Sequence, residues 1–250
     1  MTKIHLITQK NECPNCSLRE VCLPVEAPAG LQEEDFRQLN AVIKQSKKLK
    51  KGEYLFHAGE SFSSLFAIRT GFFKTSVNTQ DGRDQVTGFF MSGELVGMDG
   101  ISINKYACDA VALEDSEVCE LPFDRLEELQ KHMPQLNLHF FRLMSREIVR
   151  DQNVMLLLGN MRAEERLAVF LLNLSDRLRM RGFAANDFIL RMSREEIGSY
   201  LGLKLETVSR TLSRFNQEGL ISVEHKHIKI LQPDVLQAMI SGCEGRRHVA

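Results

Sequence analysis

The stretch from Leu136 to Met161 constrains the fold most, because it predicts one long helix with two apolar faces. One face follows the alternating three- and four-residue steps of a coiled-coil seam. The seam consists of Phe141, Met144, Ile148, Asp151, Met155 and Leu158. The other face carries Leu143, Leu156 and Leu157, which would pack the helix against its own domain. We therefore expect a dimerisation helix over residues 135–161.

Asp151 lies in the middle of this seam and makes the expected dimer marginal. A parallel two-fold pairing would bring Asp151 close to its own copy, where the two like charges repel. The alternative is an ordinary amphipathic helix in which Asp151 is solvated. A cysteine cluster upstream and a DNA-reading pattern downstream favour the dimer.

The composition, with 43% hydrophobic and 26% charged residues in 250, is that of a soluble globular protein with one or two domains. No apolar run approaches the roughly 20 residues that span a bilayer, and residues 1–10 lack a signal-peptide core. We expect a cytoplasmic protein with no membrane partner. Residues 1–159 contain 18 basic and 22 acidic side chains, and residues 160–250 contain 14 basic and 11 acidic side chains. The carboxyl-terminal third is therefore the part suited to a polyanion.

Three cysteines, Cys13, Cys16 and Cys22, lie close together in an arm of residues 1–30. This short segment cannot build its own core, so a metal or cluster would order it. Three thiolates with one distant fourth ligand suit an iron–sulfur cluster better than zinc, although zinc and free reactive thiols remain alternatives. Cys108 and Cys119 are candidates for the fourth ligand, but Cys119 shares a strand face with apolar residues and can equally be a core thiol.

Residues 31–134 predict a short helix followed by an antiparallel jelly roll. The helix covers residues 31–43, and the lysines between residues 44 and 51 indicate a solvated surface. Short β-like runs separated by glycines then follow at 54–56, 65–68, 72–77, 85–90, 107–113 and 117–121. A helix over residues 123–131 precedes the break at Pro134.

The most specific local pattern is a helix-turn-helix at residues 194–213, within a domain of residues 162–235. Ser193 and Glu196 form a capping box, Gly198 is small where two helices cross, and Gly202 makes the turn. Two strand-like runs around His225 and His227 add a wing, where these histidines suit solvent or phosphate better than a metal. We expect residues 236–250 to form a tail.

The second helix of this pattern presents a polar outer face, composed of Glu206, Ser209, Arg210, Ser213 and Arg214. An Arg can donate two hydrogen bonds to a guanine, a Glu can accept from a cytosine amino group, and a Ser can reach a base or a phosphate. A plain helical hairpin with a charged face is the alternative. Cap, turn and wing together favour binding to double-stranded DNA.

The order of these parts resembles the cyclic AMP receptor superfamily, and within it the oxygen-sensing fumarate and nitrate reduction regulators. The resemblance rests on the Cys13–Cys22 spacing and on residues 65–71, 93–95, 118–123, 142–145, 163–168 and 206–210. It implies an α+β fold, with an N-terminal jelly-roll barrel like those that bind cyclic nucleotides, a long dimerisation helix and a C-terminal winged helix-turn-helix.

The resemblance implies one [4Fe–4S] cluster per chain on Cys13, Cys16, Cys22 and Cys119. It implies a regulator that dimerises when it carries the cluster under anaerobic conditions, binds paired half-sites of the type TTGAT, and activates or represses genes of anaerobic metabolism. Glu206, Ser209 and Arg210 would read bases. An exposed turn would contact RNA polymerase, and it consists of Asp81, Gly82, Arg83 and Asp84.

The sequence departs from the superfamily pattern at the site that would bind a cyclic nucleotide. Cyclic-nucleotide binders of the superfamily hold the phosphate with an Arg-Ser pair, whereas residues 105–110 contain no such pair and place Asp109 nearby. We therefore expect the cluster, and no cyclic nucleotide, to be the signal. A thiol- or zinc-based redox regulator is the alternative. A cluster-bearing enzyme or electron carrier is disfavoured, because the chain has no Walker loop, nucleophile elbow or His-Glu-x-x-His motif.

Overall fold

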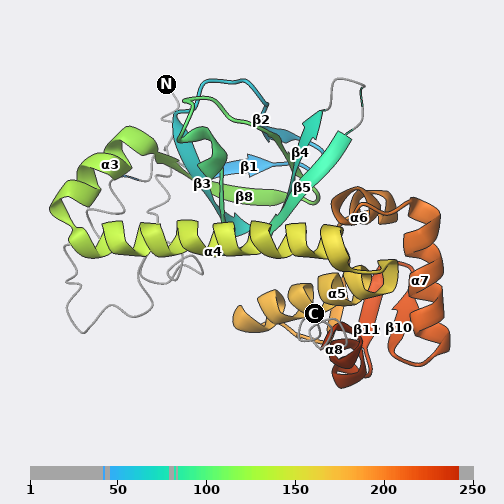
Figure 1. The fold of residues 1–250 in the computed structure, drawn as a ribbon. Coiled ribbons are helices and arrows are strands. Elements are labelled where there is room, and N and C mark those ends of the chain that lie inside the picture. Colours follow the sequence, from blue (N-terminus) through green and yellow to red (C-terminus); the bar gives the residue numbers. More distant parts are fainter. Residues whose placement is uncertain (1–41, 43–45, 79–81, 83, 242–250) are drawn as a thin grey trace, which may run out of the picture.

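The structure is a computed structural model that describes residues 42, 46–78, 82 and 84–241. A jelly roll is followed by a long helix that runs beneath it to a winged-helix unit at the other end (Figure 1). The expected fold class, with its jelly roll, long helix and winged helix-turn-helix, is confirmed. None of the described helices combines the length and apolar character that a membrane span needs.

The jelly roll consists of two antiparallel four-stranded sheets. The first has the order β1 (Ser46–Leu49), β8 (Ser116–Pro122), β3 (Ser64–Thr70) and β6 (Leu95–Val96). The second has the order β2 (Tyr54–Phe56), β7 (Asp109–Ala112), β4 (Phe72–Asn78) and β5 (Asp84–Met91). Alternate side chains of both sheets fill the space between them. There the Tyr106 ring stacks on Phe56 at 3.9 Å between centroids, and its hydroxyl donates to the Ser64 carbonyl at 2.8 Å.

The described lysines before the barrel are exposed, as expected for a solvated surface, but the segment that carries them also forms a strand that the sequence analysis missed. Residues 46–49 form β1, which pairs along its whole length with β8. Lys47 and Lys48 are exposed, but Leu49 is buried between the sheets. One buried residue in a four-residue edge strand leaves no alternation for the sequence to show.

Helices α3 (Phe123–His132) and α4 (Pro134–Asn160) cover the outer face of the first sheet. Pro134 occupies the first turn of α4, where a missing N–H costs no helical hydrogen bond. Of the second apolar face expected on this helix, Leu157 is buried and Leu143 is partly buried. Leu156 is 45% exposed, so it does not join the core as expected.

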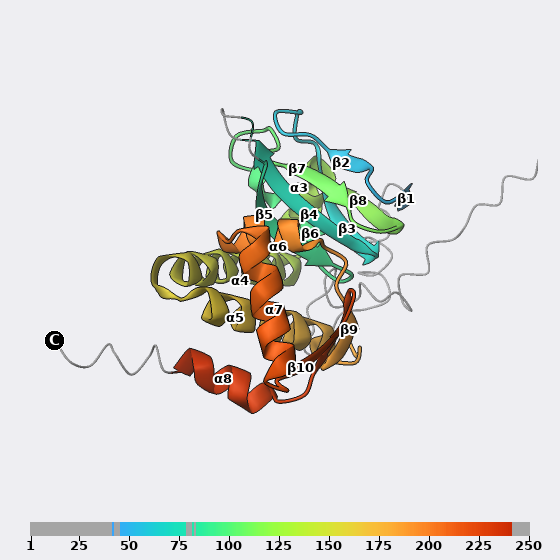
Figure 2. The ribbon, with the colours of Figure 1, turned by 90° about the vertical axis from the view of Figure 1, so that its right-hand side faces the viewer.

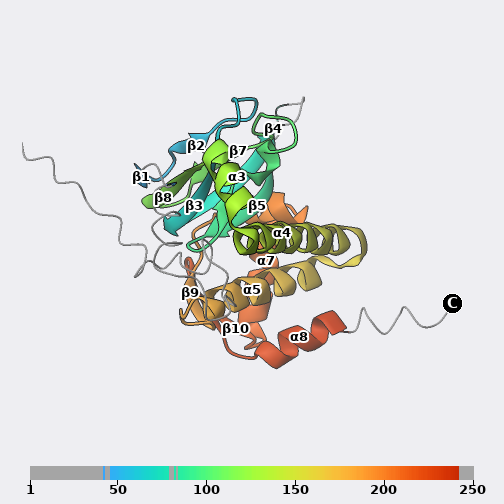
Figure 3. The ribbon, with the colours of Figure 1, turned by 90° about the vertical axis from the view of Figure 1, so that its left-hand side faces the viewer.

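The winged-helix unit begins with α5 (Ala163–Met180), which lies alongside α4 (Figure 3). The remaining elements are β9 (Asp187–Ile189), α6 (Arg194–Leu201), α7 (Leu205–Gln217), β10 (Ile221–Glu224), β11 (His227–Ile230) and α8 (Pro233–Ser241). Its sheet has the order β10-β11-β9. Helix α8 continues past residue 236, where we expected a tail to begin, and buries Leu236 against the core.

The jelly roll and the winged-helix unit share one apolar core and an ionic contact. Phe89 and Met91 of β5 belong to the same buried cluster as the winged-helix core. In the turn between β5 and β6, the Glu94 carboxylate accepts hydrogen bonds from Arg177 at 2.6 and 3.0 Å and from Arg181 at 2.7 Å. Burial opposes the ionisation of Glu94, but the two guanidinium groups outweigh it and lower the pKa of this carboxyl.

We predict that Glu94→Gln lowers the free energy of unfolding by roughly 3 kcal/mol, because it leaves two largely buried guanidinium groups without their carboxylate. Urea unfolding monitored by circular dichroism would measure the loss. Because the pKa of Glu94 is lowered in the folded protein, its stabilising effect is fully present at pH values above the unfolded-state pKa of about 4.5. This stabilisation is lost as the pH falls through the lower, folded-state pKa.

The matched control is Glu117→Gln. Glu117 also pairs with an arginine, but its partner Arg69 is 44% exposed, so the expected loss is below about 1 kcal/mol. Equal losses in the two variants would show that the contact between the units contributes no more than a surface ion pair.

Candidate DNA-binding surface and sensory residues

The helix-turn-helix is built by local interactions that the sequence indicates. At the start of α6 the Ser193 hydroxyl accepts from the Glu196 amide at 3.1 Å, and the Glu196 carboxylate accepts from the Ser193 amide at 2.7 Å. Gly202 ends α6 in the left-handed conformation, with φ of 63°. A Cβ atom at Gly198 would lie 2.5 Å from the Leu203 carbonyl oxygen. Only glycine therefore allows the turn after α6 to pack this closely against the helix.

Helix α7 is amphipathic and lies at the surface of the molecule, in front of the other elements in Figure 2. Val208, Leu212 and Phe215 are buried against α5 and α6. The opposite face carries the side chains expected to contact DNA. Glu206, Arg210 and Ser213 are exposed, and Ser209 is partly exposed. This helix therefore has the recognition-helix position of a helix-turn-helix.

The five residues expected to contact DNA differ in whether their side chains already form hydrogen bonds or ion pairs within the chain. Within the described part of the chain, Glu206 and Arg210 have no side-chain hydrogen bond or ion pair, so they can bond to bases. The Ser213 hydroxyl donates to the Ser209 carbonyl at 3.0 Å. Arg214 forms ion pairs with Glu164 and Glu218, so its guanidinium group is already engaged within the chain.

The wing adds a second polar surface beside α7. The turn between β10 and β11 places His225 at φ of 57°, next to the exposed Lys226. Arg194, Ser213, Asn216 and His225 line a shallow pocket between α6, α7 and the wing. The sequence analysis missed Arg194. Its position directly after the capping Ser193, at a helix start that favours phosphate, was the available signal.

The expected dimer seam lies along α4 and is largely uncovered. Phe141, Ile148 and Met155 are 57%, 56% and 70% exposed, and Leu158 and Asp151 are also exposed. Met144 differs, because it packs partly against the core between α4 and the first sheet. An apolar stripe of this length on a single chain is typical of an interaction surface.

The two cysteines in the described residues have different surroundings. Cys119 lies on the outer face of the first sheet, in the apolar cluster that also contains Val42. Cys108 lies between the sheets, with its sulfur 3.4 Å from an Asp99 carboxylate oxygen. Burial and the Asp99 charge both raise the pKa of the Cys108 thiol. Cys108 is therefore held as a neutral thiol, which is a poor metal ligand.

The other expected cluster ligands, Cys13, Cys16 and Cys22, lie outside the described residues. Within those that are described, no group of three or more potential metal ligands comes together. Of the expected polymerase turn, Gly82 and Asp84 are exposed, whereas Asp81 and Arg83 lie outside the described residues. The Asp84 carbonyl accepts from Ser199 of α6 at 3.0 Å, so this turn adjoins the contact between jelly roll and winged helix.

A sensory jelly roll joined by a long helix to a winged helix-turn-helix defines a DNA-binding transcription regulator rather than an enzyme. Two family models agree with the two units. Residues 46–132 match the cyclic nucleotide-binding domain, and residues 165–239 match the Crp-like helix-turn-helix domain.

The chain is 49% identical over 240 residues to the transcriptional activator protein anr of Pseudomonas aeruginosa, with 96% of each chain covered. It is 44% identical over 227 residues to the fumarate and nitrate reduction regulatory protein of Salmonella typhimurium, covering 91% of this chain and 89% of that one. The solved structure of FixK2 from Bradyrhizobium japonicum has a TM-score of 0.72 at 29% identity, covering 78% of this chain and 96% of that chain. The chain therefore belongs to the fumarate and nitrate reduction regulators of the Crp/Fnr family.

We predict that Arg210→Ala and Lys226→Ala weaken DNA binding in different ways. Arg210 can bond a base, so its loss should reduce discrimination at one base pair by about 1–3 kcal/mol. Lys226 lies on the wing, so its loss should weaken binding to all sequences equally. It should also reduce the slope of the binding constant against salt concentration, on logarithmic scales, by about one. Titrations against paired TTGAT half-sites with single base changes would measure both. The same pattern of loss in the two variants would contradict the assignment.

Proposed function

We propose that this protein is a cytoplasmic, oxygen-responsive transcription regulator that holds a [4Fe–4S] cluster on Cys13, Cys16, Cys22 and Cys119 and binds palindromic promoter DNA as a homodimer. The position of Cys119 is the observation that most favours this function. When bound, the cluster would supply a link between the arm and the barrel that oxygen can break. The thiolate-rich ligand set suits iron and sulfide better than a hard cation.

The strand register supports a link between Cys119 and the amino-terminal arm. Ser46, the first residue of β1, lies directly opposite Cys119 in β8. Directly opposed residues have Cα atoms roughly 4.5–5.5 Å apart. Val42, four residues earlier, packs into the same apolar cluster as Cys119. The chain that leads from the cysteine-rich arm therefore enters the barrel beside this thiol, whereas Cys108 lies between the sheets.

The same sheet face connects Cys119 to the expected dimer seam. Cys119 packs in one cluster with Leu136 and Phe140, which belong to the first turns of α4. Any change in how the arm packs at Cys119 can therefore shift the amino-terminal half of the seam helix. We infer that holding the arm there favours a packing of α4 in which the two Asp151 carboxylates are tolerated. Dimerisation then places two recognition helices about 34 Å apart, one turn of DNA.

A bare-thiol or zinc-based redox regulator of the same fold remains the second candidate, because it would use the same cysteines. Contact with RNA polymerase, and activation or repression of genes of anaerobic metabolism, are also part of the proposal.

We predict that protein isolated without oxygen contains about four irons and four sulfides per chain, and that Cys119→Ser loses most of this iron. Cys108→Ser is the matched control, because it changes the other buried thiol and should keep the iron. Iron and sulfide analysis, together with operator binding before and after exposure to air, would measure both effects. A colourless, metal-free wild-type protein that still binds its operator tightly as a dimer would overturn the proposal.

We predict that Asp151→Ala forms a dimer and binds operator DNA in air, because it removes the like-charge repulsion from the seam. Asp176→Ala is the control, since it removes an exposed aspartate from α5 without touching the seam. Sedimentation and gel-shift measurements in air would compare the two. If the Asp151 variant remains monomeric, repulsion at this position does not limit dimerisation.

A further inference from the structure

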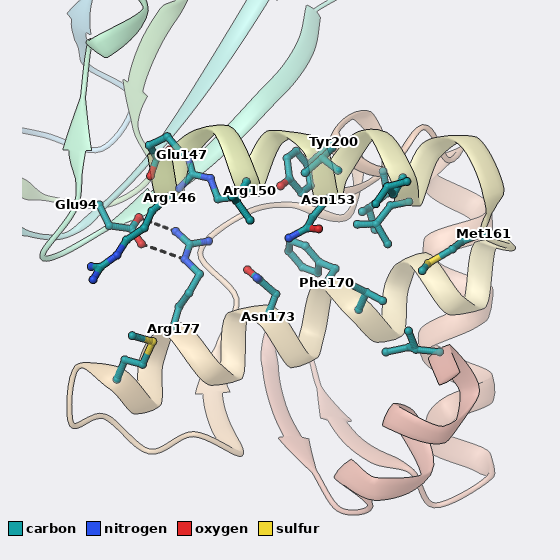
Figure 4. A pocket seen from close by; sticks show the side chains of 18 of the residues that line it. Glu94, Arg146, Glu147, Arg150, Asn153, Met161, Phe170, Asn173, Arg177 and Tyr200 are labelled. Atoms are coloured by element: carbon teal, nitrogen blue, oxygen red, sulfur yellow. Dashed lines mark hydrogen bonds and ion pairs between the residues drawn. The ribbon is translucent and has the colours of Figure 1, made fainter. Parts of the chain in front are cut away.

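A cavity of about 810 Å³ lies between α4, α5 and the turn from β5 to β6 (Figure 4). None of the six seam residues lines it. Successive helical residues are rotated by about 100°, and this puts the lining residues Arg150, Asn153 and Leu157 on the side of α4 largely opposite to the seam. A dimer formed through the seam would therefore leave the cavity open.

The lining is charged at one end and largely apolar around Met161, where Arg162 and Glu165 also contribute to it (Figure 4). Arginines and glutamates gather at the end near Glu94. Asn153 of α4 and Asn173 of α5 face each other near the middle. Leu157, Met161 and Phe170 line the part towards the carboxyl end of α4. Since a helix rises about 1.5 Å per residue, Arg146 and Met161 are roughly 22 Å apart along α4.

The charged end has more positive than negative groups. Its four guanidinium groups belong to Arg146, Arg150, Arg177 and Arg181, and its two carboxylates belong to Glu94 and Glu147. Glu94 is engaged by Arg177 and Arg181, and Glu147 by Arg150. Burial raises the pKa of Glu147 to about 7, so its charge is incomplete at neutral pH.

Arg146 is the donor that remains available at this end. It is exposed, and within the described part of the chain it forms no ion pair. A guanidinium group with free N–H donors binds a carboxylate through two parallel hydrogen bonds. The Asn153 and Asn173 amides also have no hydrogen-bond partner among the described residues, so they could bond to a ligand that passes between α4 and α5.

We propose that this cavity binds a long-chain carboxylate, with its head group at Arg146 and its hydrocarbon chain running between the two asparagines towards Leu157 and Met161. The length, the free guanidinium group at the charged end and the apolar side chains around Leu157 and Phe170 all suit an elongated amphiphile. The volume lies within the roughly 300–1,000 Å³ range of small-molecule sites.

Titration of palmitate into the full-length chain, below the concentration at which palmitate forms micelles, tests this site by isothermal titration calorimetry. We expect one saturable site per chain. Hexadecanol, which has the same chain without the charge, should bind at least about tenfold more weakly, a difference of about 1.4 kcal/mol. Butyrate, which has the charge without the chain, should not bind measurably. Absence of saturable palmitate binding, or equal binding of palmitate and hexadecanol, overturns the proposal.

Two substitutions locate the site. Arg146→Glu should weaken palmitate binding at least about tenfold, whereas Arg179→Glu, on the exposed surface of α5 outside the cavity, should not change it. Asn173→Trp should block the middle of the cavity and abolish binding, with circular dichroism confirming the fold. Palmitate binding that persists unchanged in Arg146→Glu overturns the proposal, whatever the tryptophan variant does. Iron content and operator affinity are separate measurements, so failure here leaves the proposed function intact.

Discussion

The Glu94 carboxylate fixes how the two functional units of this molecule sit together. It is largely buried in a turn of the jelly roll, and it pairs with Arg177 of α5 and with Arg181, which directly follows this helix. One of them, Arg177, also donates to the Phe89 carbonyl at 2.7 Å, so the backbone of β5 is held to the same helix. Charges removed from water this far are stable only in a well-defined geometry. The contact therefore specifies one orientation of the units more than it adds net stability.

The contact between β5 and α6 extends this attachment to the helix-turn-helix itself. The Ser199 hydroxyl accepts from the Val86 amide at 2.8 Å, and Lys74 pairs with Glu196 at 3.1 Å. Glu196 also caps α6, so a single carboxylate joins the start of that helix to the second sheet. Packed and hydrogen-bonded groups therefore connect the barrel directly to the helix-turn-helix.

Much of this architecture could be predicted, because local chemistry repeats along the chain. Alternation revealed most strands, and the Ser193 cap located the start of the helix-turn-helix at Arg194, although its second helix runs to Gln217 and so passes the expected end at residue 213. What the sequence hid depends on tertiary context. The edge strand β1 shows one buried leucine among lysines, and the sequence pattern does not show that Cys119 faces outwards from the first sheet while Cys108 lies between the sheets. The ion pair of Arg214 with Glu164 and the role of Glu94 arise from partners more than forty residues away.

The shared apolar core has a consequence for dividing the protein into fragments. Phe72, Val86, Phe89, Met91 and Leu113 of the barrel are buried in the same cluster as the winged helix. Cutting the chain after α4 would expose the faces of Phe170 and Tyr200 that now contact Phe89, at ring distances of 6.1 and 5.2 Å. An excised DNA-reading module would therefore be prone to aggregate unless this face were given polar side chains. Transplanting it onto another sensor would require a replacement for the aromatic surface of β5.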